Sequence, residues 1–188
     1  MKRAIGYAFL FAWVAFAGGV QLLLLACAPQ IGSDLAAFVR ASVPDLMTLV
    51  LVASVGRLAS RDVIMIGAVA ALARVAFTGA SPFAILAGSI AVALVADAIR
   101  GFAELDRPSL RFFAAGSGAL AFGLWLLFVD LARSGAARES GALGFGRVEA
   151  GDVLLPFATA VMTALVGLLL WPVLQRLPGL GKLERRAF

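Results

Sequence analysis

Long apolar runs separated by short polar stretches fill the chain from one end to the other. About 20 helical residues, rising about 1.5 Å each, cross the roughly 30 Å hydrocarbon core of a bilayer, so runs of this length predict transmembrane helices. The pattern predicts an all-α bundle of six such helices in a single transmembrane domain, 1–188. Their expected ranges are 4–28, 43–57, 62–78, 82–100, 112–132 and 153–175.

Local signals divide the apolar region 44–78 into two short helices. A single helix of that length would measure about 50 Å and would hold Arg57 and Arg61 in mid-membrane, so "RLASRD" is predicted to be a basic turn. "TGASP" (78–82) carries the Gly and Pro of a second tight turn. A longer loop is expected over 133–152.

The second helix has the signals of a helix N-terminus. Ser42 can cap it, and Pro44 fits the first turn, where a missing N–H costs nothing. Asp45 suits the positive end of the helix dipole. The sequence therefore assigns Asp45 to the start of a helix, and no further role is predicted for it.

The distribution of basic residues predicts the orientation. Most of the 16 Lys and Arg residues fall at helix ends on the side of the two termini, provided that the chain crosses six times. Cytoplasmic loops carry the excess of Lys and Arg, so both termini are expected in the cytoplasm. Five spans would put the basic tail outside.

Composition agrees with a membrane protein. The chain is 62% hydrophobic with a mean hydropathy of +1.00, whereas soluble domains are roughly 45–50% apolar. The net charge of +5 is therefore assigned to the membrane surface and not to nucleic acid. The first run, 4–28, is too long for a signal-peptide core of about 7–15 residues, although Leu24–Cys27 loosely resembles a lipoprotein cleavage box.

Residue types exclude much of common enzymology. The chain has no histidine and a single cysteine, Cys27, so an imidazole base, a His-ligated metal and an intrachain disulfide are ruled out. Its serines lack a neighbouring base that would activate a nucleophile. We therefore expect no cofactor, no metal site and no catalytic residues.

Arg74 lies inside the third apolar run. A buried charge costs about 2.5–3.5 kcal/mol on insertion scales, so Arg74 is expected to face protein or water and to have a counter-charge. The candidates within spans are Asp97 and Asp130. Asp97 has a local alternative in Arg100, three residues along its helix, and Asp130 has interfacial solvation near Arg133. Arg74 is thus either a structural residue, which includes snorkelling outward to water, or a contact to a partner helix or an anionic ligand.

Small residues recur at helical spacing in two of the predicted spans. Gly116, Ala119 and Gly123 share much of one face in the fifth span. Such faces let helices approach closely, either within the bundle, which is the simpler expectation, or against another membrane protein. In the first span the candidate packing face consists of Ala4, Ala8, Ala12 and Ala15.

Three stretches together resemble the rod shape-determining protein MreD family, which are small six-span proteins of the bacterial inner membrane. They are "PDLMTLVLVASVG" (44–56), "GAVAALARVAFTGASPFAI" (67–85) and "TALVGLLLWPVLQRL" (163–177). In one respect the chain departs from the family, since many members carry an acidic residue where Arg74 stands. Any role of that acid cannot be transferred to Arg74, which is expected to answer a correspondingly changed neighbour.

The resemblance implies a non-enzymatic part of the cell-elongation machinery that maintains rod shape. Its implied partners are MreC, the actin-like MreB filament and the elongation-phase peptidoglycan synthases, besides the lipid bilayer. The alternative is a substrate-binding S component of an energy-coupling-factor vitamin transporter, a six-span bundle of similar size. The alanine ladder of the first span resembles the docking face of such proteins, but the polar and aromatic groups that a vitamin site needs are scattered.

Overall fold

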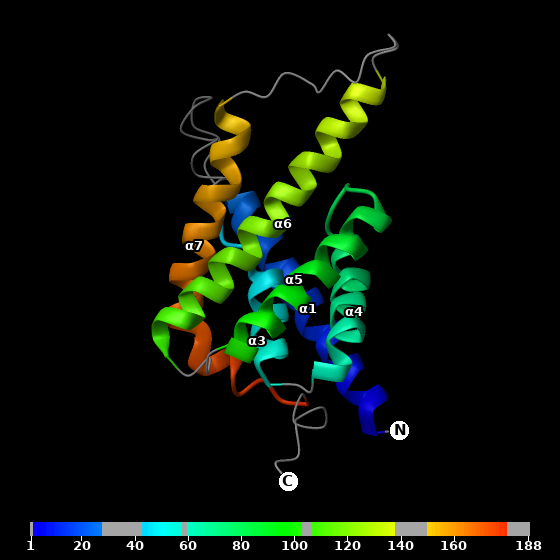
Figure 1. Cartoon of the computed structure of the whole chain (residues 1–188). Helices are drawn as coiled ribbons and strands as arrows, with labels where there is room; N and C mark the ends of the chain where they lie inside the picture. The colour runs from blue at the N-terminus through cyan, green and yellow to red at the C-terminus, as the bar shows by residue number, and fades with distance from the viewer. Residues whose placement is uncertain (1, 28–42, 58–59, 103–106, 138–149, 180–188) are drawn as a thin grey trace.

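The computed structural model describes residues 2–27, 43–57, 60–102, 107–137 and 150–179. Regular structure within these ranges is helical throughout (Figure 1). The helices are α1 (Lys2–Cys27), α3 (Leu46–Arg57), the short 3-10 helix η1 (Ser60–Asp62), α4 (Val63–Val75), α5 (Pro82–Phe102), α6 (Pro108–Ala137) and α7 (Ala150–Leu174).

Four of these helices contain a segment long and apolar enough to cross a membrane: Arg3–Cys27, Pro82–Gly101, Pro108–Arg133 and Val153–Leu174. The chain is therefore a helical membrane protein. The predicted spans 43–57 and 62–78 correspond to α3 and α4, which are apolar but only 12 and 13 residues long. At about 1.5 Å per residue, each covers roughly 18–20 Å, less than the hydrocarbon thickness, so the count of six spans stays a prediction.

Some helix bounds differ from those expected. α6 begins at Pro108 and continues to Ala137, because proline is well suited to the first helical position and the chain after 132 keeps helix-forming alanines. α4 ends at Val75, before the expected end of its span at 78. The two ends of the expected loop 133–152 are therefore helical. The middle of that loop, 138–149, lies outside the described residues.

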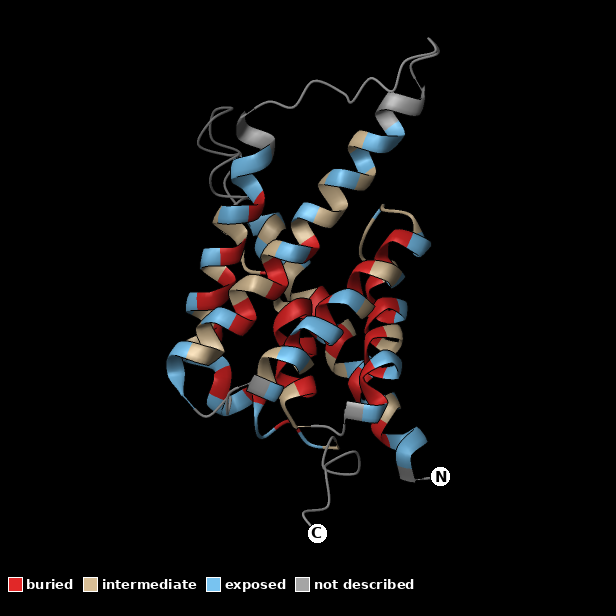
Figure 2. Ribbon diagram, in the orientation of Figure 1, coloured by how far each residue is buried: buried red, intermediate tan, exposed pale blue. Residues whose placement is uncertain are grey.

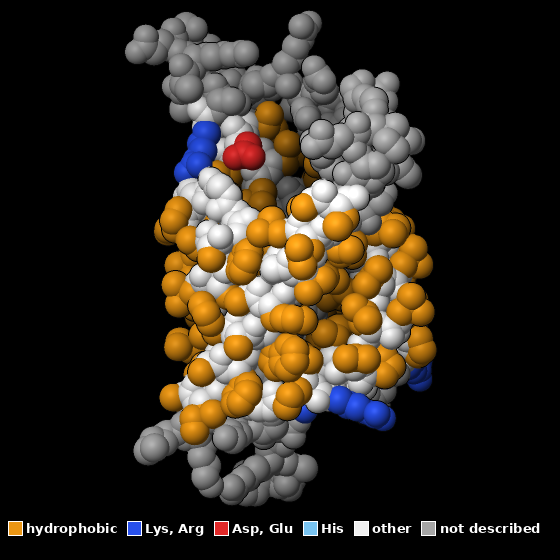
Figure 3. Space-filling model, turned by 180° about the vertical axis from the view of Figure 1, so that it is seen from behind, with side chains coloured by type: hydrophobic (Ala, Val, Ile, Leu, Met, Phe, Trp, Pro, Cys, Tyr) orange, Lys and Arg blue, Asp and Glu red, His pale blue; other side chains and the backbone are white. Residues whose placement is uncertain are grey.

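The ends of the helices group by charge. α1 begins, α3 ends, α4 begins, α5 ends, α6 begins and α7 ends at the lower end of the bundle in Figure 1, which we call the basal end. Arg3 of α1 and Asp62 of η1 form an ion pair of 3.5 Å there. Basic side chains border the apolar surface at this end in Figure 3. The arginines in or next to these helix ends are Arg3, Arg57, Arg61, Arg100, Arg107, Arg111 and Arg176.

The short helix α3 occupies the centre of the bundle. Nine consecutive residues, Met47 to Val55, are buried, and α3 contacts α1, α4, α5, α6 and α7. Figure 2 shows the buried residues gathered around it. A helix that is apolar on all sides is stable only when other helices surround it, which explains why α3 has no lipid-facing stripe.

The outer surface of the bundle is apolar. Large side chains such as Phe16, Leu72, Phe83 and Leu169 are more than half exposed, and Figure 3 shows hydrophobic groups covering the middle of one face. In water such a surface would aggregate, whereas hydrocarbon solvates it.

At the crossing of α4 and α5, a glycine lies directly against the backbone of the other helix. A Cβ placed on Gly67 would lie 2.8 Å from the Cα atom of Ile90 and 3.1 Å from the carbonyl oxygen of Ser89. Both neighbours are backbone atoms, so the two helices must separate to admit a side chain. Small residues at such crossings allow the close packing on which helix association in membranes depends.

Gly67→Ala is expected to destabilise the protein by about 1–3 kcal/mol through overpacking of the α4–α5 crossing. Thermal unfolding in detergent measures this as a melting temperature several degrees lower. The matched control is Gly19→Ala in α1, where a Cβ meets nothing within 4 Å, so its melting temperature should stay constant or rise. Equal melting temperatures for the two variants would show that the crossing has room.

Candidate functional site

Arg74 and Asp45 form an ion pair inside the bundle. Arg74 lies in the last turn of α4 and is 5% exposed, and Asp45 precedes α3 and is 6% exposed. The Nη2 atom of Arg74 donates to Oδ2 of Asp45. Pairing of opposite charges, with hydrogen bonds between them, is what makes buried charges tolerable in an apolar interior.

Thr48 joins the two charges. Its hydroxyl accepts a hydrogen bond of 2.9 Å from Nη1 of Arg74 and donates one of 2.7 Å to Oδ2 of Asp45. Its backbone N–H donates to Oδ1 of Asp45 over 3.0 Å. Asp45 therefore caps the N-terminus of α3 and holds the guanidinium with the same carboxylate.

Thr163 connects this pair to α7. The backbone N–H of Asp45 donates to the Thr163 hydroxyl over 2.8 Å, and that hydroxyl donates to the carbonyl of Thr159 over 2.6 Å. Thr163 and Thr48 have no exposed surface. In an apolar interior these hydroxyls satisfy groups that water cannot reach, so the start of α3 is fixed against α7.

Phe122 of α6 covers the remaining face of the arginine. The Cζ atom of Arg74 lies 3.6 Å from the centroid of the Phe122 ring, which is 3% exposed. A guanidinium over an aromatic face gains a cation–π attraction that grows when water is excluded. One turn earlier, a Cβ on Gly118 would lie 3.4 Å from the Thr48 side chain, so the glycine lets α6 approach.

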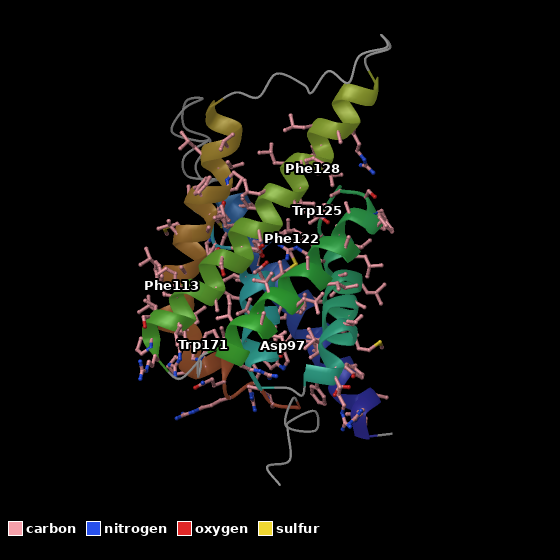
Figure 4. The ribbon with its side chains drawn as sticks, viewed as in Figure 1. Asp97, Phe113, Phe122, Trp125, Phe128 and Trp171 are labelled. Atoms are coloured by element: carbon pink, nitrogen blue, oxygen red, sulfur yellow. The ribbon has the colours of Figure 1, made fainter. Side chains whose placement is uncertain are left out.

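We call Asp45, Thr48, Arg74, Phe122 and Thr163 the Arg74 cluster. Its members come from α4, α6, α7 and the start of α3, and Phe122 marks its position in Figure 4. The cluster has the chemistry of a structural cross-link, since its polar groups bind one another, apart from Nε of Arg74, which has no hydrogen-bond partner within the described residues.

The two carboxylates that the sequence suggested as ion-pair partners of Arg74, Asp97 and Asp130, lie elsewhere. Asp97 pairs with Arg100 through Oδ1 and Nη2 over 2.7 Å, which is the local alternative, and Figure 4 shows Asp97 near the basal end. Arg100 also donates to the carbonyl of Val55 over 2.8 Å. Asp130 is exposed on α6. The expectation that Asp97 or Asp130 pairs with Arg74 is therefore wrong, because Asp45 lies closer to its guanidinium.

The alanine ladder of α1 does not pack inside the bundle. Ala4, Ala8 and Ala12 are exposed and Ala15 is half-buried. Leu10 and Val14 point inward instead, with no exposed surface. Larger side chains on the neighbouring face fill the contacts with α3 and α4, so the expectation of internal packing is wrong for the three exposed alanines.

The small residues of α6 do pack internally. A Cβ on Gly116 would lie 3.2 Å from Cβ of Ala164, and one on Gly123 would lie 3.0 Å from Cβ of Pro156, so both glycines bring α6 against α7. Ala119, which lies between the two glycines in the sequence, is also buried. The expectation for this helix is confirmed.

Comparison with known proteins gives no relative: no protein-family model, no curated protein and no solved structure matches the chain.

Arg74→Leu is expected to destabilise the protein by about 3–5 kcal/mol, because it leaves the Asp45 carboxylate buried without a counter-charge. Adding Asp45→Asn should restore much of the loss, since asparagine keeps the cap on α3 without the charge. Thermal unfolding of the two single variants and the double variant in detergent measures the coupling.

Asp130→Asn is the matched control for this cycle, because it removes a carboxylate from an exposed position on α6. It should leave the melting temperature unchanged and should not rescue Arg74→Leu. Strictly additive effects of Arg74→Leu and Asp45→Asn would show that the two side chains do not interact in the membrane protein.

Proposed function

We propose that this protein is a non-enzymatic scaffold of the bacterial cell-elongation machinery, of the MreD type, in the inner membrane. In this function it links MreC and MreB with lateral peptidoglycan synthesis and so maintains rod shape. The proposal rests on the resemblance of residues 44–56, 67–85 and 163–177 to the MreD family and on one structural observation. Those three stretches meet at the Arg74 cluster. The first contributes Asp45 and Thr48, the second Arg74, and the third Thr163.

The meeting of these stretches supports a shared structural core. The other two stretches both bind Asp45: Arg74 bonds to its carboxylate, and Thr163 accepts a hydrogen bond from its backbone N–H. A scaffold needs a rigid body that presents fixed outer faces to its partners. Polar groups that bind one another in the interior supply that rigidity and leave the apolar outer faces for helix contacts.

The basal end supports an orientation with six spans and both termini in the cytoplasm. Seven arginines lie at that end, and the described part of the opposite end holds Arg133, in α6. This asymmetry follows the positive-inside rule. A basic cytoplasmic end is attracted to the anionic lipids of the inner leaflet and faces the compartment of MreB.

Cysteine accessibility tests this orientation. In a Cys27→Ser background, Arg133→Cys should react with a membrane-impermeant maleimide added to spheroplasts, whereas Arg107→Cys should react only after the membrane is opened. Both positions are exposed and belong to, or directly precede, the same helix, α6. The reverse labelling pattern would place the basal end outside and contradict the proposed orientation.

Affinity purification tests the function. The tagged protein, extracted from its native membrane in mild detergent, should bring down MreC and wall-synthesis enzymes, identified by mass spectrometry. Depletion in the rod-shaped host should give rounded cells, and a wild-type copy should restore rods. Normal rods after depletion, without suppressor mutations, would contradict the scaffold function.

An S component of an energy-coupling-factor transporter is the second candidate, favoured by the exposed face of Ala4, Ala8 and Ala12 on α1. In that case the purification should instead recover a transmembrane coupling protein with two ATPases. Ala8→Leu should then abolish its recovery, while Ile5→Leu, at an exposed position that is already bulky, should not. Recovery of the coupling protein in place of MreC would overturn the scaffold proposal.

A further inference from the structure

A pocket of about 310 Å³ lies between α1 and the basal end of α7. Its lining consists of Trp13 from α1 together with Pro172, Val173, Arg176, Leu177 and Pro178. Five of these six side chains are apolar or aromatic and one is cationic. The pocket lies outside the Arg74 cluster, with which it shares no residue.

The chain after α7 is held in place to form this pocket. The backbone N–H groups of Arg176 and Leu177 donate to the carbonyls of Val173 and Leu174 over 2.9 and 3.4 Å. Leu177 is buried, and the indole N–H of Trp13 donates to the carbonyl of Pro178 over 3.2 Å. The turn is therefore fixed to α1 by a hydrogen bond and an apolar anchor.

Arg176 is the charged group of this pocket. It is exposed, and its guanidinium makes no hydrogen bond or ion pair with a side chain in the described part of the chain. The other basic residues of the basal end add to the positive potential there, so the pocket favours an anion. A guanidinium binds phosphate oxygens through two parallel N–H groups.

The apolar walls restrict the kind of anion. Val173 is 61% exposed and Pro172 is also exposed, so both offer apolar surface that a small hydrated anion would leave uncovered. A ligand with a phosphate at one end and hydrocarbon at the other satisfies both parts of the pocket.

We propose that this pocket binds one anionic phospholipid, with its phosphate at Arg176 and an acyl chain along Pro172 and Val173. The site would fix the basal end of α7 and α1 to the anionic leaflet. It does not depend on the identity of the protein partners proposed above.

Native mass spectrometry of the purified protein tests the site with defined lipids. Phosphatidylglycerol added with an equal amount of phosphatidylcholine should give one preferentially retained phosphatidylglycerol molecule. Arg176→Gln should weaken its binding about fivefold, the effect of one basic residue near an anionic surface. The matched control is Arg107→Gln, an exposed arginine at the same end but outside the pocket, which should leave binding unchanged.

Two further experiments distinguish binding of a lipid from binding of a free anion and from attraction to surface charge in general. Glycerol phosphate or inorganic phosphate at the same concentration should not displace the bound lipid, because neither fills the apolar walls. Val173→Asp should weaken phosphatidylglycerol binding as Arg176→Gln does. Equal weakening by Arg107→Gln, displacement by free phosphate, or equal retention of phosphatidylcholine would each overturn the proposal.

Discussion

The positive charge of Arg74 inside an apolar helix bundle is the constraint on which the rest of the interior depends. An unpaired charge there would cost several kcal/mol, comparable to the whole stability of many proteins. Three groups surround and stabilise the guanidinium: the Asp45 carboxylate, the Thr48 hydroxyl and the Phe122 ring. Each of these groups then needs a fixed position, and that requirement determines how α3, α4 and α6 meet.

Asp45 makes the central helix possible. α3 begins inside the bundle, where its first N–H groups cannot reach water, and the Asp45 carboxylate satisfies one of them at Thr48. The same residue's backbone N–H is satisfied by Thr163 of α7. One short, all-round apolar helix is thus positioned by polar contacts at one end and by burial along its length.

The positions of the helices could be predicted from the sequence, but the contacts of the Arg74 cluster were not. Apolar runs bounded by Gly, Pro and Arg predicted the positions of all of the described α-helices, because a helix in lipid or in a protein core needs a long run of apolar residues. The partner of Arg74 was within reach of the same reasoning. Asp45 and Arg74 lie about equally far from the basic turn 57–62, so adjacent antiparallel helices bring them to one depth. Asp97, in contrast, lies near the basal end, on the side of that turn. Phe122 and Thr163 were out of reach, because their contacts depend on how distant helices rotate.

Nuclear magnetic resonance of the Arg74 guanidinium tests the buried ion pair most directly. In detergent micelles with ¹⁵N-labelled arginine, the Nη groups of Arg74, assigned by their loss in Arg74→Lys, should give separate signals that exchange slowly with water. Their sharp separation should disappear in Asp45→Asn, because the carboxylate that restricts the guanidinium is gone. Rapidly exchanging, averaged Nη signals in the unmodified protein, like those of exposed arginines, would contradict a guanidinium held between Asp45 and Phe122.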